Sequence, residues 1–284
     1  MIDLFWPYVP DEAIAEVTKV LNSRFIGQGP KVDLFEKEFE KFFNLRYVAA
    51  VNSGTSALEI AYELIGLKPG DTVISTPLTC TATNLMLLRK GCKIVWADIL
   101  EDTLCISPED VRHKLTEKTK AVVQVHLGGI KADVGILPVP VVSDAAQALG
   151  IFNGQYSCCS FQAIKHISTG DGGMLILNTQ DSERDRNNAK LLRWFGIDRN
   201  KKIKNNWQAY KERQMTFDIK LPGSKRHMND IAAVMGIVGL RHYNEIIAYR
   251  KKLFCIYKEA FKDMDGIKLI DGDVNTYWLA TVLV

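Results

Sequence analysis

The chain has 284 residues, of which 47% are hydrophobic and 24% charged, and its formal net charge is only +3. This composition is typical of a globular protein that buries a sizeable core, as one large domain or as one large and one small domain. The slight charge, without a strong basic cluster, argues against nucleic-acid binding. The N-terminus lacks the pattern of a signal peptide, and no apolar run approaches the length of a membrane span, so no membrane partner is expected.

The six cysteines form no C-x-x-C pair and have no histidine spacing suited to zinc, so no metal site is predicted. The adjacent residues Cys158 and Cys159 would point to opposite faces of a strand, which predicts that both are buried. This pattern favours a reducing cytoplasm as the location.

The first elements in the chain are two amphipathic helices, predicted over residues 11–22 and 32–43, with a flexible loop at 25–30. Short β-branched runs then alternate with helical segments. The predicted strands are 47–51, 72–75, 93–97, 121–125, 139–142, 158–161 and 174–177, and the predicted helices among them are 56–65, 83–90 and 108–115. This alternation predicts an α/β fold, a mostly parallel seven-stranded sheet with flanking helices, which binds ligands beyond the carboxyl ends of its strands.

Two of the connections between predicted strands are unusually short. Only about eight residues separate position 130 from 139, and the link from 151 to 158 is also brief. Parallel neighbours need a crossover of a dozen or more residues. Either these strands are not adjacent in the sheet, or their crossover helices have been reduced to loops.

The last third of the chain is more polar and more helical. A helix is expected over residues 181–194, a charged loop over 198–213, and one long helix from Asn229 or Asp230 to about residue 264. The final run, 277–284, is predicted to be a strand. No turn or closing helix follows it, so we expect the last domain to be incomplete.

Three motifs carry the chemistry. The segment Asn52-Ser53-Gly54-Thr55-Ser56 joins a strand to a helix, where backbone N–H groups and hydroxyls can bind phosphate, although the motif alone favours an ordinary N-cap. Asp144 ends an apolar strand; it would cap a following helix or pair with a buried cation such as a pyridinium nitrogen. Lys165 follows another apolar run and can form an imine with an aldehyde, although most lysines are solvated surface charges.

These motifs become specific when they are taken together. A phosphate site, a strand-end aspartate and a strand-end lysine, in that chain order, match the three needs of pyridoxal 5′-phosphate (PLP): an anchor for the phosphate, a partner for the pyridinium, and an amine for the Schiff base.

In these and further motifs, the chain resembles the DegT/DnrJ/StrS family of sugar aminotransferases, in the fold-type-I class of PLP enzymes. The resemblance covers almost the whole length. It rests on Pro7-Tyr8-Val9-Pro10, Phe25-Ile26-Gly27-Gln28-Gly29, Ser53-Gly54-Thr55-Ser56-Ala57-Leu58, Lys68-Pro69-Gly70-Asp71, Val125-His126-Leu127-Gly128-Gly129, Asp144-Ala145-Ala146-Gln147, Ser160-Phe161-Gln162-x-x-Lys165, Thr169-Gly170-Asp171-Gly172-Gly173, Arg193-Trp194-Phe195-Gly196-Ile197-Asp198-Arg199 and His227-Met228-Asn229-Asp230-Ile231-Ala232-Ala233.

The resemblance implies a role for each matching residue. Lys165 would be the catalytic residue, which holds the cofactor as a Schiff base and transfers the proton between the substrate carbon and the C4′ carbon. Asp144 would pair with the pyridinium nitrogen, and Gln147 would lie near the ring hydroxyl. The phosphate would be bound by Gly54, Thr55 and Ser160. The domains implied are a PLP-binding large domain over 1–239 and a partial α+β small domain over 240–284.

The family also implies a homodimer with shared active sites, in which an asparagine of the partner chain often completes the phosphate site. Lys225 occupies that position here and could neutralise phosphate as a point charge. A second departure is Cys80, which stands where the family usually stacks an aromatic ring on the cofactor. The shortened connections and the point at which the sequence stops are further departures.

The leading functional hypothesis is a transaminase that moves an amino group, with glutamate as donor, to a nucleotide-linked keto-deoxysugar. The turn at 169–173 resembles members that act at sugar C4, such as GDP-perosamine synthases, which make deoxyaminosugars for lipopolysaccharide O-antigens. One alternative is the family's sugar dehydratase branch, which has histidine in place of the Schiff-base lysine; Lys165 argues against it, and His166 is interpreted as structural. The other is a catalytically weakened binding or regulatory protein.

Overall fold

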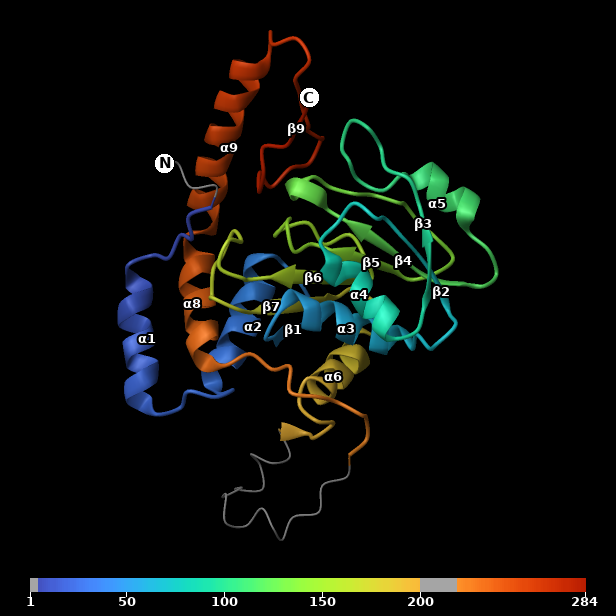
Figure 1. Cartoon of the computed structure of the whole chain (residues 1–284). Helices are drawn as coiled ribbons and strands as arrows, with labels where there is room; N and C mark the ends of the chain where they lie inside the picture. Colours follow the sequence, from blue (N-terminus) through green and yellow to red (C-terminus); the bar gives the residue numbers. More distant parts are fainter. Residues whose placement is uncertain (1–4, 200–218) are drawn as a thin grey trace.

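A seven-stranded sheet forms the centre of the molecule (Figure 1), and the computed structural model describes residues 5–199 and 219–284. The strand order is β1-β7-β6-β5-β4-β2-β3. The strands are β1 (Val48–Val51), β2 (Thr72–Ser75), β3 (Lys93–Trp96), β4 (Thr119–Val125), β5 (Val141–Asp144), β6 (Tyr156–Ser160) and β7 (Gly173–Leu177). The β2 to β6 strands pair in parallel, whereas β7 runs antiparallel to both β1 and β6. The predicted α/β class and its mostly parallel sheet are confirmed.

Helices cover both faces of this sheet. They are α1 (Glu12–Ser23), α2 (Pro30–Phe42), α3 (Gly54–Ile65), α4 (Thr81–Arg89), α5 (Pro108–Lys114), α6 (Ser182–Leu192), α8 (Asp230–Arg241) and α9 (Tyr243–Phe261). One buried cluster packs α3 against the sheet and includes Cys158, while a second packs α2 and α8 against it and includes Cys159. The two cysteines therefore face opposite sides of β6, as their adjacency predicted.

The two short connections are explained by the loss of helices. The strands β4 and β5 are parallel neighbours, and so are β5 and β6. The first link contains only a single 3-10 turn, Leu127–Gly129, and the second contains no helix. The crossover helices have thus been reduced to loops, and the link after β4 places the Gly128-Gly129 backbone beside the site described below.

Two predictions for the C-terminal part are wrong. The expected single helix from residue 229 or 230 to 264 breaks at His242, whose φ of −93° and ψ of 0° end α8 before α9 begins. The buried residue Tyr243 anchors this junction, because its hydroxyl donates to the carbonyl oxygen of Leu149. The expected strand over 277–284 is reduced to β9 (Val282–Leu283), which pairs with β8 (Lys268–Leu269).

The backbone before β9 bonds to a turn instead of to a strand. Tyr277 has a left-handed φ of 57°, and the N–H groups of Thr276 and Leu279 donate to the carbonyl oxygens of Gly129 and Gly128. These bonds bring the segment 274–281 onto the turn after β4, and this placement determines the surroundings of Lys165. Of the charged loop predicted over 198–213, residues 200–213 lie outside the described part.

Within residues 5–199 and 219–284, no helix combines the length and the apolar character needed to cross a membrane. The same ranges contain no cluster of histidine, cysteine, aspartate and glutamate side chains that could hold a metal ion.

Candidate active site

Asp144 is the last residue of β5 and is only 5% exposed. Its carboxylate accepts hydrogen bonds from the Thr83 hydroxyl (2.7 Å) and from the backbone N–H of Ala146 (3.0 Å). Burial raises the pKa of Asp144, although these bonds and the charge of Lys165 lower it in part. Within the described ranges no cationic side chain forms an ion pair with this carboxylate. Such a buried acid would be stabilised by a cationic group on a ligand.

Lys165 lies in the loop that connects β6 to β7, in a half-buried position. Its amine lies 3.9 Å from the centre of the Trp278 ring. Burial lowers the pKa of Lys165, while the nearby Asp144 and Cys80 act in the opposite direction. A lowered pKa increases the fraction of neutral amine, which is the nucleophilic form.

The start of α3 lies against the end of β6. The Ser53 hydroxyl accepts from the backbone N–H of Ser56 (3.1 Å), so the motif is an N-cap as the simpler interpretation held. The site is also shaped for an anion, because a Cβ added to Gly54 would lie 2.9 Å from the Cβ of Ser160. Glycine therefore allows the N-terminus of α3 to approach the end of β6 closely at Ser160, and Thr55 occupies the first turn of the same helix.

The three remaining predicted residues are Gln147, Cys80 and Lys225. The Gln147 side chain accepts from the backbone N–H of Gly128 (2.7 Å), which fixes it on the turn after β4. Cys80 is exposed directly before α4 and is close enough to Lys165 to affect its charge. Lys225 is exposed in the segment beside the end of β1, where its backbone pairs with Trp194. The fold thus brings Asp144 and Cys80 near Lys165 and joins Gly54 to Ser160 at the end of β6, the neighbour of β5, whereas Lys225 is exposed beside Trp194.

Two residues of this site were missed by the sequence reasoning. Thr83 is fully buried and donates to Asp144, and Trp278 covers the Lys165 amine. Thr83 lies only three residues after Cys80, so its hydroxyl could have been considered together with that position. No local pattern around Trp278 pointed to the site, because its partner Ile164 lies 114 residues earlier in the chain.

The residues present fit PLP. A buried carboxylate with a raised pKa suits a pyridinium, a half-buried amine with a lowered pKa suits a Schiff base, and the glycine-lined junction of α3 with β6 suits a phosphate. When bound, this cofactor withdraws electrons from a carbon attached to an amino nitrogen, so that a proton can leave that carbon.

Replacing Asp144 with asparagine is expected to lower transamination activity by about 10²-fold, because the neutral amide cannot stabilise a buried cation as the carboxylate does. The change is nearly isosteric, so the fold should be retained. Steady-state kinetics of Asp144→Asn would be compared with those of Asp133→Asn, which changes an exposed aspartate. Equal activity in Asp144→Asn and the control would contradict the role assigned to this carboxylate.

Comparison with known proteins identifies the family of the chain and its cofactor. The family model described as the DegT/DnrJ/EryC1/StrS aminotransferase family matches residues 7–284. The spore coat polysaccharide biosynthesis protein SpsC of Bacillus subtilis (strain 168) is 35% identical over 98% of this chain and 74% of its own.

Solved structures agree over nearly the whole chain. The aminotransferase TlmJ from Streptoalloteichus hindustanus superposes with a TM-score of 0.88 at 28% identity, over 99% of this chain and 78% of its own. The PLP form of the putative sugar aminotransferase Spr1654 from Streptococcus pneumoniae gives a TM-score of 0.87 at 25% identity, over 99% and 77%. The chain belongs to the DegT/DnrJ/EryC1/StrS family of sugar aminotransferases, which depend on PLP.

Proposed function

We propose that this protein transfers an amino group from an amino acid, with glutamate as the first candidate, to C4 of a nucleotide-linked keto-deoxysugar. The observation that carries the proposal is that the half-buried Lys165, in the loop after β6, lies near enough to the buried Asp144 at the end of the neighbouring strand β5 for that carboxylate to raise its pKa. Asp144 would hold the cofactor ring as a cation, while Gly54, Thr55 and Ser160 would bind its phosphate. Lys165 would carry the proton to and from the substrate carbon.

Three further residues would complete the site. Gln147, held by Gly128, would contact the ring hydroxyl, and Cys80 would pack on the ring face where relatives have an aromatic side chain. Lys225 would reach the phosphate of a partner subunit. The six cysteines are all free thiols, which is consistent with a protein that works in the reducing cytoplasm.

The test is a panel of GDP-, UDP- and dTDP-linked 4-keto and 3-keto sugars, incubated with PLP, glutamate and the purified protein. We expect a glutamate-dependent mass shift from ketone to amine for a 4-keto sugar, and none with Lys165→Ala. Glutamate should also remove the visible absorbance of the PLP-loaded protein. If that absorbance forms but glutamate leaves it unchanged, the alternative of a binding or regulatory protein is favoured.

The dehydratase alternative is disfavoured by the surroundings of Lys165. The neighbouring His166 is 2% exposed, and its Nε2 lies 2.9 Å from the carbonyl oxygen of Thr276, to which it donates. Burial lowers the pKa of His166 to about 3, so it stays neutral and bonded to the backbone. It is structural, as the sequence interpretation held, and is not placed to replace the lysine.

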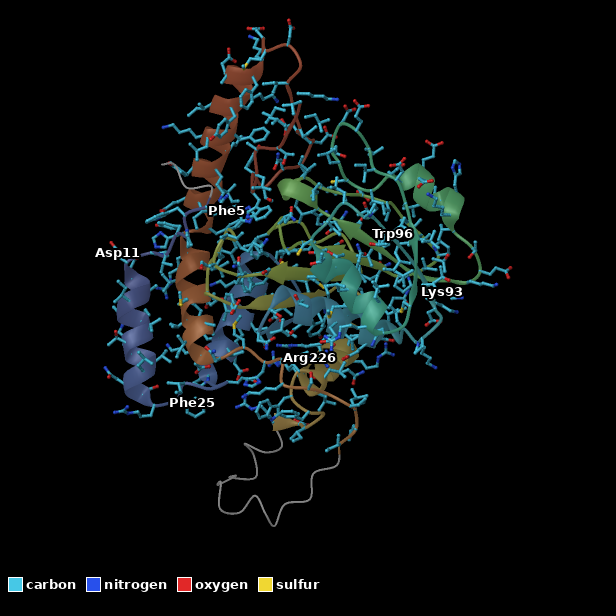
Figure 2. All side chains as sticks on the ribbon, in the orientation of Figure 1. Phe5, Asp11, Phe25, Lys93, Trp96 and Arg226 are labelled. Atoms are coloured by element: carbon cyan, nitrogen blue, oxygen red, sulfur yellow. The ribbon has the colours of Figure 1, made fainter. Side chains whose placement is uncertain are left out.

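We also propose that two copies of the chain associate through the face formed by α1, α2 and α8. Both α1 and α2 pack against α8 at one side of the molecule, the left in Figure 1. Large apolar side chains are exposed along this region: Trp6, Tyr8, Val9, Ile14, Leu21, Phe25, Ile26, Leu34 and Phe42. Figure 2 shows Phe25 at the far end of α1.

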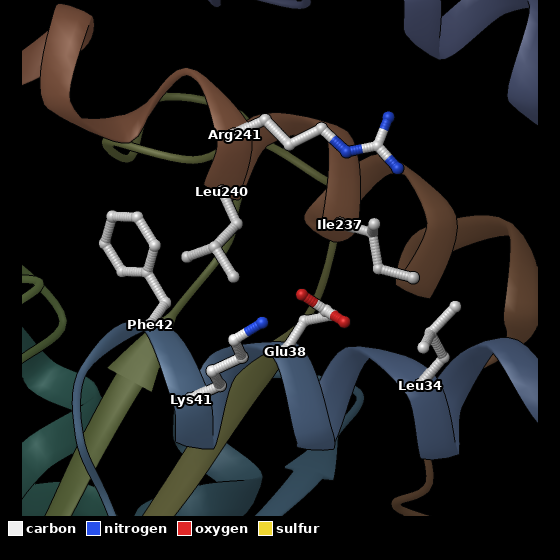
Figure 3. A pocket seen from close by; sticks show the side chains of 7 residues that line it. All are labelled: Leu34, Glu38, Lys41, Phe42, Ile237, Leu240 and Arg241. Atoms are coloured by element: carbon white, nitrogen blue, oxygen red, sulfur yellow. The ribbon is translucent and has the colours of Figure 1, made fainter.

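A groove between α2 and α8 offers room on this face for side chains of the second copy. Its volume is about 410 Å³. Apolar and charged side chains line it together (Figure 3): Leu34, Phe42, Ile237 and Leu240, with Glu38, Lys41 and Arg241. A homodimer would cover these exposed apolar side chains.

Replacing Phe25 with glutamate is expected to raise the dissociation constant of the dimer by about tenfold or more, because a charge would be buried at the interface. The protein should therefore shift from dimer to monomer. Light scattering after size exclusion gives the mass directly. Lys93→Glu, a charge change on the edge strand β3, is the matched control. A monomeric parent protein, or a dimer that Phe25→Glu leaves intact, would contradict this face.

A further inference from the structure

The amine of Lys165 faces an aromatic ring from a distant part of the chain. Its nitrogen lies 3.9 Å from the centre of the Trp278 ring, well within the range of a cation–π contact. Trp278 is 8% exposed and precedes the short strand β9. The sequence motifs that define the site do not include it.

The residues on both sides of Lys165 are bonded to the segment that carries this ring. On one side, the indole N–H of Trp278 donates to the backbone carbonyl oxygen of Ile164 (3.1 Å). On the other, the imidazole Nε2 of His166 donates to the backbone carbonyl oxygen of Thr276 (2.9 Å). These two hydrogen bonds, one on each side of the contact, hold the Trp278 ring next to the Lys165 side chain.

Further contacts fix the same segment. Phe5 stacks on the Trp278 ring at 6.0 Å between centroids, and Arg250 on α9 donates to the carbonyl oxygen of Trp278 (3.1 Å). Thr276 and Leu279 bond to Gly129 and Gly128, and Gly128 in turn holds Gln147. The Trp278 ring thus has little freedom to leave the Lys165 amine.

We propose that Trp278 is a positioning residue for Lys165, whose ring face holds the ammonium form of the amine beside Asp144 whenever the lysine is not bonded to a cofactor. This proposal rests on the proposed function, because it assumes that Lys165 is released and re-bonded in each catalytic cycle. A held amine stays within reach of the carbon to which it must return.

The charged and titratable groups that face the amine set the expected direction. Burial lowers the pKa of Lys165, whereas Arg250 and Lys165 both act on the neighbouring His166, whose pKa burial also lowers. Asp144 and Cys80 raise the pKa of Lys165. The ring adds to this second group, because its negative face stabilises a cation. Removing the ring while keeping an apolar side chain should therefore lower the pKa of the amine by about 0.5 to 1.5 units.

The test measures how fast PLP added to cofactor-free protein generates the Lys165-dependent visible absorbance, from pH 6 to about pH 10. Only the neutral amine attacks the aldehyde, so the midpoint of the rate profile reports the pKa of the amine. The ionisations of free PLP are the same for every variant and cancel in the comparison. Trp278→Leu and Trp278→Phe form a matched pair, since both lose the indole N–H and only the second keeps a ring.

We expect the midpoint of Trp278→Leu to lie about 0.5 to 1.5 pH units below that of Trp278→Phe, with Trp278→Phe close to the parent. Trp96→Leu, on the edge strand β3, should shift nothing. Equal midpoints for the two Trp278 variants would overturn the proposal. A parent protein without Lys165-dependent absorbance would instead count against the proposed function.

A second measurement decides the matter if Trp278→Leu does not fold or if no cofactor binds. The indole emission of Trp278 should change as the adjacent amine titrates, so the tryptophan fluorescence of the cofactor-free parent should show a titration step near the pKa of Lys165. Lys165→Met should lack this step. A step that persists in Lys165→Met, or no step in the parent, would overturn the contact.

Discussion

Replacing Lys165 with alanine is expected to lower the rate of transamination by about 10³-fold or more and to abolish the visible absorbance of the PLP-loaded protein. Alanine removes both the covalent bond to the cofactor and the group that moves the proton, and proton transfer alone is worth about 10²- to 10⁴-fold. The fold should persist, because the half-buried side chain contacts a ring and forms no buried ion pair. Absorbance spectra and single-turnover kinetics with glutamate would measure both effects.

Lys165→Arg is the matched control for this experiment. It keeps a cation beside Asp144 and the Trp278 ring, but its guanidinium stays protonated and cannot form a Schiff base. We expect it to be as inactive as Lys165→Ala while binding PLP more tightly. Appreciable activity in either variant would mean that another group supplies the amine, and the assignment of Lys165 would be wrong.

Replacing Arg193 with methionine is expected to lower the free energy of unfolding by about 3 kcal/mol. Arg193 is 2% exposed; its guanidinium pairs with the fully buried Glu36 and donates to the carbonyl oxygen of Ala50 (2.7 Å). Glu36 also accepts from the N–H of Ala50 and pairs with Lys190, so α2, β1 and α6 meet at one carboxylate. Methionine would leave the buried Glu36 with Lys190 as its main partner.

Unfolding in urea would measure this loss, and the double variant Glu36→Gln with Arg193→Met should recover part of it, since no buried charge is then left unpaired. Lys262→Met, which removes an exposed pair with Glu259, should change stability by less than about 0.5 kcal/mol. A loss no larger in Arg193→Met than in Lys262→Met would show that the buried pair contributes little.

The same carboxylate gives an acid dependence whose sign follows from its pKa. Burial alone would raise the pKa of Glu36, but Arg193, Lys190 and the Ala50 bond outweigh it and lower the pKa from 4.5 to about 2. A carboxyl with a lowered folded-state pKa adds stability above its unfolded pKa and loses it as the pH falls toward the folded one. Stability should therefore fall between pH 4.5 and 2, and Glu36→Gln should lack this part of the decline.

The sheet could be predicted well from the sequence, because the strands are short runs bounded by polar or turn residues, and all of them except the edge strand β3 are largely buried. The seven predicted runs match β1 to β7 within a few residues at their ends. The antiparallel direction of β7 carries no such signal, since a buried strand looks the same in either direction. The break at His242 was missed for a related reason: both helices continue the same apolar spacing, and the junction is set by the contact of Tyr243 with Leu149.

The residues of the candidate site also fall into those that the sequence predicted and those that it missed. Asp144, Lys165 and the Gly54 turn lie at strand ends, where the chain order and the motif together predict the chemistry. Thr83 and Trp278 were missed because each reaches the site from an element whose own pattern reads as ordinary helix or strand. Contacts between residues far apart in the chain depend on the folded arrangement, and one sequence does not encode them locally.

The antiparallel pairing of β6 with β7 has a consequence for changes of loop length. Because Ser160 pairs with Gly173, the loop that carries Lys165 begins and ends at neighbouring positions of the sheet. One residue inserted on either side of Lys165 would have to bulge within this closed span and would carry the amine away from Asp144. Residues 161–172 should therefore be the part of the chain in which relatives vary least in length.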